Sequence, residues 1–260
     1  MNSGFGWEWF IKQFELISKI DLTLYKRAQM ERRILSFMKT VDTNDYDKFI
    51  TLLRSDTRIY HRFIEHLTIN VSEFFRNPNQ WEVLEKTIIP ALLSEKKPLQ
   101  VWSAGCSTGE EAYSLSMLFK EKFKGQVETI LATDLDNEVL DKAMTALYTS
   151  KAVQTLPVSY RDRYMVKDGE YYRVTDEIKK MVKFQRHNLL RDPFSRNFDL
   201  ILCRNVVIYF TEESKTQLYR KFADSLRPGG ILFIGSTEQI FQSRELGFTT
   251  NETFFYKKNQ

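Results

Sequence analysis

Apolar residues recur every three or four positions through the first 70 residues of the chain, and this spacing predicts helices. The clearest repeat joins Trp7, Phe10, Ile11 and Phe14, which would form one stripe along a helix. The predicted helices cover residues 7–20, 25–38, 44–53 and 57–66. Strand-like alternation is missing from this part of the sequence. We therefore predict a small helical domain over residues 1–70, followed by a linker and helix over residues 71–98.

A second pattern begins at Leu99, where short apolar runs alternate with helical segments. The predicted strands cover residues 99–102, 127–132, 198–208, 231–234 and 248–257. Such alternation predicts a mostly parallel sheet with helices on both faces, so residues 99–260 form an α/β domain. Residues 147–184 interrupt it with β-prone pieces around Lys167-Asp-Gly169, which predicts a small hairpin insert.

Composition narrows the class of protein. The chain has 260 residues, 42% hydrophobic and 28% charged, without a membrane-spanning run or a signal peptide, so we expect a cytoplasmic protein. Cys106 and Cys203 lack any partner spacing, and the three histidines are scattered, so we expect neither a disulfide nor a metal site. A net charge of +4 is too small for a strong nucleic-acid footprint.

The segment Leu99–Leu118 joins a strand to a helix through a loop of small residues. Gly105 and Gly109 lie in this loop, where they could let the backbone approach a ligand. Such turns also arise from packing alone, and this stretch does not decide between the two interpretations.

Ligands bind beyond the carboxyl ends of parallel strands, and four stretches expected at such ends carry polar residues. These ends carry the Gly105 loop, Asp134, the stretch from His187 to Leu189, and Arg204-Asn205. Asp134 could bind sugar hydroxyls or simply cap a helix, although Asp136 is better placed for a cap. Glu111 would repel a phosphate but suits a cationic ligand. This favours S-adenosylmethionine (SAM) over NAD or ATP.

Four motifs together resemble the CheR-type chemotaxis receptor methyltransferases. They begin at Asn70 (NVSEFFR), Val101 (VWSAGCSTGEEAYS), Ala132 (ATDLD) and Cys203 (CRNVVIYF), and the resemblance covers nearly the whole chain. It implies a class I SAM-dependent fold: a Rossmann-like, mostly parallel sheet with an antiparallel C-terminal strand, an N-terminal helical domain and a small antiparallel β insert. It also implies glutamate O-methylation of methyl-accepting chemotaxis proteins, with S-adenosylhomocysteine (SAH) as product. We expect a monomer without membrane insertion.

The resemblance also assigns residues. The implied cofactor contacts, with Gly105 added from the loop, are Asn70, Ser72, Arg76, Gly105, Glu111, Asp134, Asn188, Leu189, Arg204 and Asn205. The resemblance places Tyr209 near the transferred methyl group. We predict that Arg76 and Tyr209 are the catalytic residues that position the reacting groups, although Arg76 could instead hold the carboxylate of the cofactor. The basic second helix would dock the receptor through Lys26, Arg27, Arg32 and Arg33, although such a face can also be ordinary solvated surface.

Three other functions stay open from the sequence alone. A class I methyltransferase could act on nucleic acid or a small molecule, but the Asn-Pro-Pro-aromatic signature of amino-group methylation is absent. A non-catalytic cofactor-sensing or scaffold module would leave Tyr209 as a core residue. A dinucleotide oxidoreductase is disfavoured because the chain lacks Gly-x-Gly-x-x-Gly.

Overall fold

The computed structural model describes residues 6–68 and 71–259. The chain divides into two compact units. One holds the residues up to Ile69 together with Tyr209–Lys215, and the other holds Asn70–Ile208 and Thr216–Gln260.

The first unit is helical, as the spacing predicts. Its helices are α1 (Trp7–Ser18), α2 (Arg27–Thr40), α3 (Tyr46–Ser55) and α4 (Thr57–Thr68), with a short turn η1 (Leu22–Leu24) before α2. The core is aromatic: Phe63 of α4 lies edge-on to Phe14 of α1 and Phe49 of α3, with ring centroids 5.3 and 4.9 Å apart. All three rings are fully buried, so the predicted apolar stripes do hold this unit together.

A short segment from later in the chain packs onto this unit. The backbone N–H of Lys26 donates to the Tyr209 carbonyl at 2.9 Å, and that of Thr211 donates to the Leu24 carbonyl at 3.0 Å. Phe210 also packs edge-on against Tyr25. Tyr209 therefore belongs structurally to the helical unit.

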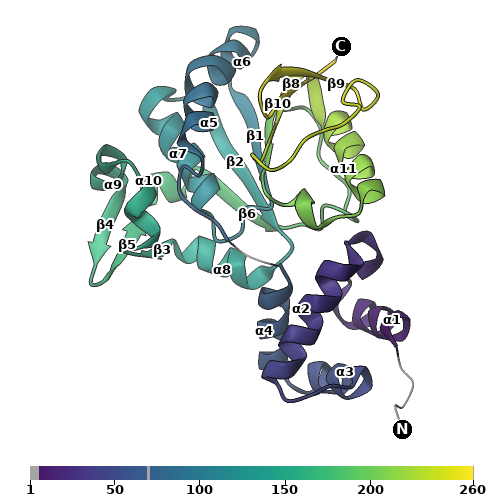
Figure 1. Ribbon diagram of the computed structural model, residues 1–260. Coiled ribbons are helices and arrows are strands. Elements are labelled where there is room, and N and C mark those ends of the chain that lie inside the picture. The colour runs from purple at the N-terminus through teal and green to yellow at the C-terminus, as the bar shows by residue number, and fades with distance from the viewer. Residues whose placement is uncertain (1–5, 69–70, 260) are drawn as a thin grey trace. The chain divides into compact units, whose positions relative to one another are not determined.

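The second unit is built on a seven-stranded sheet in the order β6-β2-β1-β7-β8-β10-β9 (Figure 1). The strands are β1 (Leu99–Ala104), β2 (Val127–Asp134), β6 (Val182–Arg186), β7 (Phe198–Cys203), β8 (Leu226–Ile234), β9 (Phe248–Glu252) and β10 (Phe255–Lys258). The pairs from β6 to β8 are parallel, and β10 pairs antiparallel with both β8 and β9. This is the predicted Rossmann-like sheet.

Helices cover both faces of the sheet. They are α5 (Pro78–Val83), a π-helical turn η2 (Leu84–Ile88), α6 (Ile89–Glu95), α7 (Glu110–Lys122), α8 (Asn137–Thr145) and α11 (Glu212–Ser225). Along β1, Val101 packs in a core with residues of α6 and α7, whereas the next residue, Trp102, packs against Phe222 of α11. Burial on both faces explains why β1 and β7 are almost continuously apolar.

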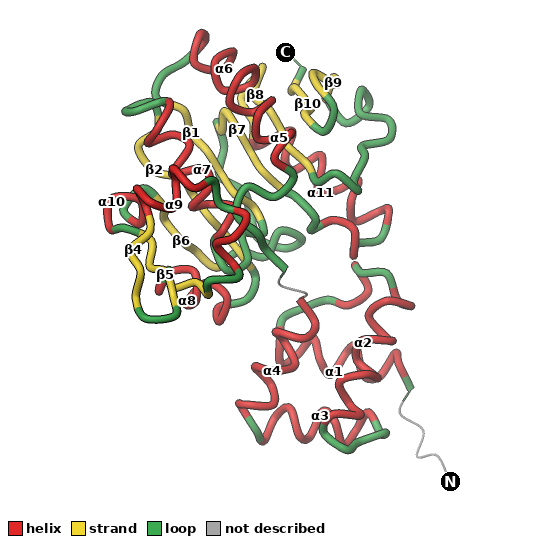
Figure 2. Tube along the Cα trace, turned by 60° about the vertical axis from the view of Figure 1, so that its left-hand side comes forward, coloured by secondary structure: helices red, strands yellow, loops and turns green. Residues whose placement is uncertain are grey.

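The insert is a separate three-stranded antiparallel sheet in the order β3-β5-β4 (Figure 1). Its strands β4 and β5 are also seen, from another side, in Figure 2. It contains β3 (Leu147–Thr149), a short turn η3 (Ala152–Thr155), α9 (Val158–Tyr164), β4 (Met165–Asp168), β5 (Tyr171–Val174) and α10 (Asp176–Lys179). The predicted hairpin is β4–β5, whose turn uses Gly169 at φ 62°. The third strand, β3, was too short to be visible in the sequence pattern.

Two predicted strands differ from the structure. The run Phe198–Ile208 is a strand only to Cys203, because Asn205 adopts a left-handed backbone conformation at φ 61°. The tail forms a hairpin, β9–β10, rather than one strand, since the chain reverses at Thr253 and Phe254. Within the described residues, no helix combines the length and the apolarity that a membrane span requires.

Candidate functional site

The predicted polar residues gather at one edge of the sheet. Strands β6, β2, β1 and β7 are consecutive neighbours and run parallel, so their carboxyl ends lie side by side. The Gly105 loop follows β1, Asp134 ends β2, Asn188 follows β6, and Arg204 follows β7. The topology thus places the predicted site residues of these four strand ends next to one another.

Asp134 links two of these loops. One carboxylate oxygen accepts the Ser107 N–H at 2.9 Å, and the other accepts the Asp136 N–H at 3.1 Å. Burial raises the pKa of the Asp134 carboxyl. The helix cap is Asp136, which accepts the Glu138 N–H at the start of α8, so the predicted division of roles between the two aspartates is confirmed for the cap.

The two loop glycines have packing reasons for their identity. Gly105 and Gly109 have φ of 82° and 93°. A Cβ on Gly105 would lie 2.5 Å from a methyl of Val206, and one on Gly109 would lie 2.9 Å from Ala143. The space beside each glycine is therefore filled by protein, and the close approach of a ligand to Gly105 stays a prediction.

The loop after β6 is held by its own polar groups. The Asn188 side chain accepts the Leu190 N–H at 3.0 Å, and its backbone N–H donates to Asp192 at 2.8 Å. Lys221 of α11 donates to the Leu189 carbonyl at 2.8 Å. Asn188 and Leu189 are both buried, so this loop presents a fixed shape at the sheet edge.

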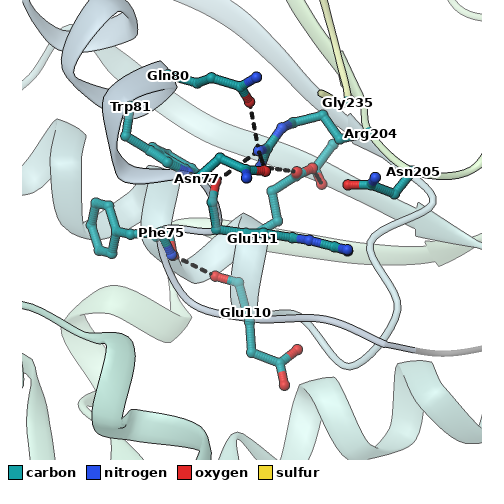
Figure 3. A network of polar contacts seen from close by, with 12 residues as sticks. Phe75, Asn77, Gln80, Trp81, Glu110, Glu111, Arg204, Asn205 and Gly235 are labelled. Carbon is teal, nitrogen blue, oxygen red and sulfur yellow. Dashed lines mark hydrogen bonds and ion pairs between the residues drawn. The ribbon is translucent and has the colours of Figure 1, made fainter. Parts of the chain in front are cut away.

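Arg204 is the centre of a buried polar network (Figure 3). Its side chain is 2% exposed and forms an ion pair with Glu111 at 3.3 Å. It also donates to the Arg76 carbonyl at 2.7 Å and to the Gln80 side chain at 2.9 Å. Desolvation lowers the pKa of Arg204, partly offset by Glu111. The sequence predicts a cationic ligand for Glu111, but in the structure this carboxylate already accepts from Arg204 and from the Ser103 hydroxyl, the latter at 2.8 Å.

The turn that carries Arg76 has an unusual backbone. Phe75 and Asn77 on either side have φ of 49° and 60°, a conformation that costs free energy for residues with a side chain. The Arg76 carbonyl accepts from both Arg204 and the Trp81 indole, and the Phe75 N–H donates to Ser114 at 3.0 Å. The network in Figure 3 therefore fixes the backbone of the turn on which Arg76 is carried.

The Asn205 side-chain oxygen and the Ser107 hydroxyl are buried at this edge and have no hydrogen-bond partner in the part of the chain that the structure describes. A buried polar atom without a partner is unfavourable unless a ligand or water satisfies it. SAM carries an amino group and ribose hydroxyls that can donate, so the residues here fit the predicted cofactor.

Two further predicted contacts precede this turn. Ser72 hydrogen-bonds the buried Glu110 carboxyl, and burial raises the pKa of that group. Asn70 lies outside the described residues. The structure does not test the role of either residue.

The predicted docking residues are partly engaged in intramolecular contacts. Arg27 pairs with Glu8 and Glu31, and Lys26 lies 3.9 Å from Glu212. Arg33 is half-buried and donates to the His66 carbonyl, which ties α2 to α4. Arg32 is exposed and lines a shallow hollow on α2 with Ala28 and Leu35. Receptor docking by this face stays a prediction.

The sequence interpretation missed Glu238, a buried carboxylate in the loop after β8. It accepts backbone N–H groups of Asn205, Val207 and Gly235. Only its proximity to the predicted strand at 231–234 could have indicated it, because two of its three partners, Asn205 and Val207, lie 33 and 31 positions earlier in the chain.

Comparison with known proteins identifies the family. The CheR methyltransferase SAM binding domain matches residues 70–255, and the CheR methyltransferase all-alpha domain matches residues 6–68. A chemotaxis protein methyltransferase from Listeria innocua is 46% identical over 240 residues, which cover 92% of each chain. One from Borreliella burgdorferi is 34% identical over 257 residues, covering 92% of this chain and 89% of that protein.

Among solved structures, the N-methyltransferase NodS from Bradyrhizobium japonicum is similar over 72% of this chain and all of that chain. The sequence identity is 13% and the TM-score is 0.40. The two domain matches and the close relatives confirm the resemblance, the fold class and the cofactor predicted from the sequence. The chain belongs to the CheR family of SAM-dependent chemotaxis protein methyltransferases.

Proposed function

We propose that this chain methylates glutamate side chains on the cytoplasmic helices of methyl-accepting chemotaxis proteins. The observation that carries this proposal is the match to both CheR domains, all-alpha and SAM-binding, in one chain. We further propose that the protein acts in the cytoplasm as a monomer and does not bind nucleic acid.

We assign the SAM site to the carboxyl ends of β6, β2, β1 and β7. The proposed contacts are Asn70, Ser72, Arg76, Gly105, Glu111, Asp134, Asn188, Leu189, Arg204 and Asn205. Arg204 would act mainly by fixing Glu111 and the Arg76 turn, because its nitrogens already bind those groups. Asn205 is the contact best supported by geometry, since its side-chain oxygen is buried without a partner among the described residues.

Bound SAM supplies a methyl group on a sulfonium, which a carboxylate oxygen can accept directly to give the ester and SAH. A glutamate carboxylate has a pKa of about 4.3 and is already ionised at neutral pH, so the chain need not supply a general base. The protein's contribution is then to align the groups and to exclude water from the nucleophile. We assign that positioning to Arg76 as a charge partner and to Tyr209 as a hydrogen-bond donor.

The test is transfer of tritiated methyl groups from SAM to receptor-containing membranes. We expect label that base releases as methanol, the signature of a methyl ester, and a large loss of this label with Asp134→Ala. Parallel reactions with RNA and DNA should stay unlabelled. Base-stable label, or label in nucleic acid but not in receptors, would contradict the proposal.

A further inference from the structure

Glu238 is bound to backbone rather than to side chains. The residue is 6% exposed, and its two carboxylate oxygens accept three N–H groups: Asn205 at 3.0 Å, Val207 at 3.1 Å and Gly235 at 2.7 Å. Two of these donors belong to the segment from Arg204 to Val207 after β7, which we call the Asn205 loop. A single side chain thus fixes the Asn205 loop against the end of β8.

We infer that Glu238 is a positioning residue that holds the Asn205 loop in the conformation that binds SAM and SAH. The inference rests on the proposed contact between Asn205 and the cofactor, and it adds a residue that does not itself touch the cofactor.

The backbone of the Asn205 loop is strained at Asn205 and packed tightly against the end of β8, so the loop needs contacts that hold it in this conformation. Asn205 adopts φ 61°, which costs free energy for a residue with a side chain, although asparagine tolerates it better than most. On the β8 side there is no spare room. A Cβ on Gly235 would lie 2.7 Å from the backbone nitrogen of Asn205 and 2.8 Å from a carboxylate oxygen of Glu238.

This placement leaves the Asn205 side chain available to a ligand. The side-chain nitrogen of Asn205 is 3.5 Å from the Thr237 hydroxyl, which is long for a hydrogen bond. The side-chain oxygen of Asn205 is buried without a partner among the described residues. A purely structural asparagine would be expected to satisfy that oxygen within the protein. The arrangement instead resembles a preformed acceptor, whose direction depends on Glu238.

The test is calorimetric titration of SAH into the full-length protein and four variants: Glu238→Gln, Asn205→Ala, their double mutant and Asp199→Asn. Glutamine keeps the size of Glu238, but its NH₂ group must face a backbone N–H, so the loop loses at least one bond. We expect SAH to bind about tenfold more weakly to each single loop variant. Because Glu238 acts through Asn205, the double mutant should be no weaker than Asn205→Ala.

Asp199→Asn is the matched control. Asp199 is also a fully buried carboxylate of the same unit that accepts a backbone N–H, but it lies at the opposite end of β7. We expect its SAH affinity to stay within about twofold of wild type. Should Glu238→Gln not fold, Gly235→Ala displaces the same loop from β8 and should weaken SAH binding comparably.

Two results would overturn the inference. One is wild-type SAH affinity in Glu238→Gln or, where that variant does not fold, in Gly235→Ala. The other is a loss of about a hundredfold in the double mutant, which would mean that the two single effects are independent. Absence of SAH binding by the wild-type protein would instead contradict the proposed function.

Discussion

The two ends of strand β7 use buried charge in different ways. At its amino end, Asp199 accepts from the side chains of Arg227 at 2.6 Å and Lys96 at 3.1 Å, besides the Gln100 N–H. At its carboxyl end, Arg204 pairs with Glu111 and also donates to the Arg76 carbonyl and to the side-chain amides of Asn77 and Gln80.

The difference separates two tasks. Buried charge that pairs with opposite charge ties elements together: Asp199 joins β7 to Lys96, before β1, and to Arg227, at the start of β8. Charge directed at backbone groups sets the shape of turns, as Arg204 does for the Arg76 turn and Glu238 does for the Asn205 loop. We therefore expect changes at the amino end to alter stability alone, and changes at the carboxyl end to alter cofactor binding as well.

The largest effect should come from Arg204→Met. Removing the guanidinium leaves the Glu111 carboxylate nearly buried without its cation and releases the Arg76 turn. We expect the free energy of unfolding to fall by about 3–5 kcal/mol and SAH affinity to fall with it. Urea denaturation and calorimetry measure the two quantities. A loss below about 1 kcal/mol would show that the network is not important for stability.

The matching change at the other end is Asp199→Asn. It weakens the interactions with Lys96 and Arg227, and we expect the free energy of unfolding to fall by about 2–3 kcal/mol. Unlike Arg204→Met, it should leave SAH affinity unchanged below the unfolding transition. A parallel loss of SAH affinity would break the distinction between the two ends.

Arg76→Lys should distinguish the structural role of the Arg76 backbone from the catalytic role of the Arg76 side chain. The network binds the Arg76 carbonyl, so stability should change by less than about 0.5 kcal/mol. Lysine cannot reproduce the bidentate geometry of arginine, so methyl transfer should fall at least about tenfold. Labelling of receptor membranes measures this rate, and full activity would remove Arg76 from its proposed role.

The smallest effect is a pH dependence at the amino end. The hydrogen bond from Arg227 lowers the pKa of Glu95, with Lys257 adding to the shift. Glu95 thus stabilises the fold above its unfolded pKa, and this contribution is lost as the pH falls through the folded value. We expect Glu95→Gln to cost less than about 1 kcal/mol at pH 7, with the difference shrinking below about pH 4.5 in urea titrations.

Glu110 and Glu238 at the carboxyl end shift in the opposite direction, because burial raises the pKa of each. For these two groups, folding becomes less favourable as the pH rises from the unfolded pKa to the folded pKa.

For Glu95, a difference in unfolding free energy between Glu95→Gln and wild type that grows on acidification would contradict the assigned sign.

The fold could be predicted because its signals are local. The stripe through Phe10 and Phe14, and the apolar runs of β1 and β7, depend only on neighbouring residues. The hairpin β9–β10 was missed because the alternation from Phe248 to Lys257 continues through its turn, where Phe254 takes φ 71°.

The location of the site could be predicted from the sequence, but the contacts within it could not. The ends of parallel strands converge in any such sheet, so Asp134, Asn188 and Asn205 could be grouped without coordinates. The pairing of Glu111 with Arg204 spans 93 positions, and the partners of Glu238 are backbone atoms that carry no sequence signal. Such contacts follow from tertiary packing and not from residue type.

The most direct test is a crystal structure of this protein with bound SAH. The account predicts SAH at the carboxyl ends of β6, β2, β1 and β7, with a donor on the Asn205 side-chain oxygen and the Glu238 bonds to Asn205 and Gly235 intact. SAH bound elsewhere, or an Asn205 side chain turned away from it, would contradict the account.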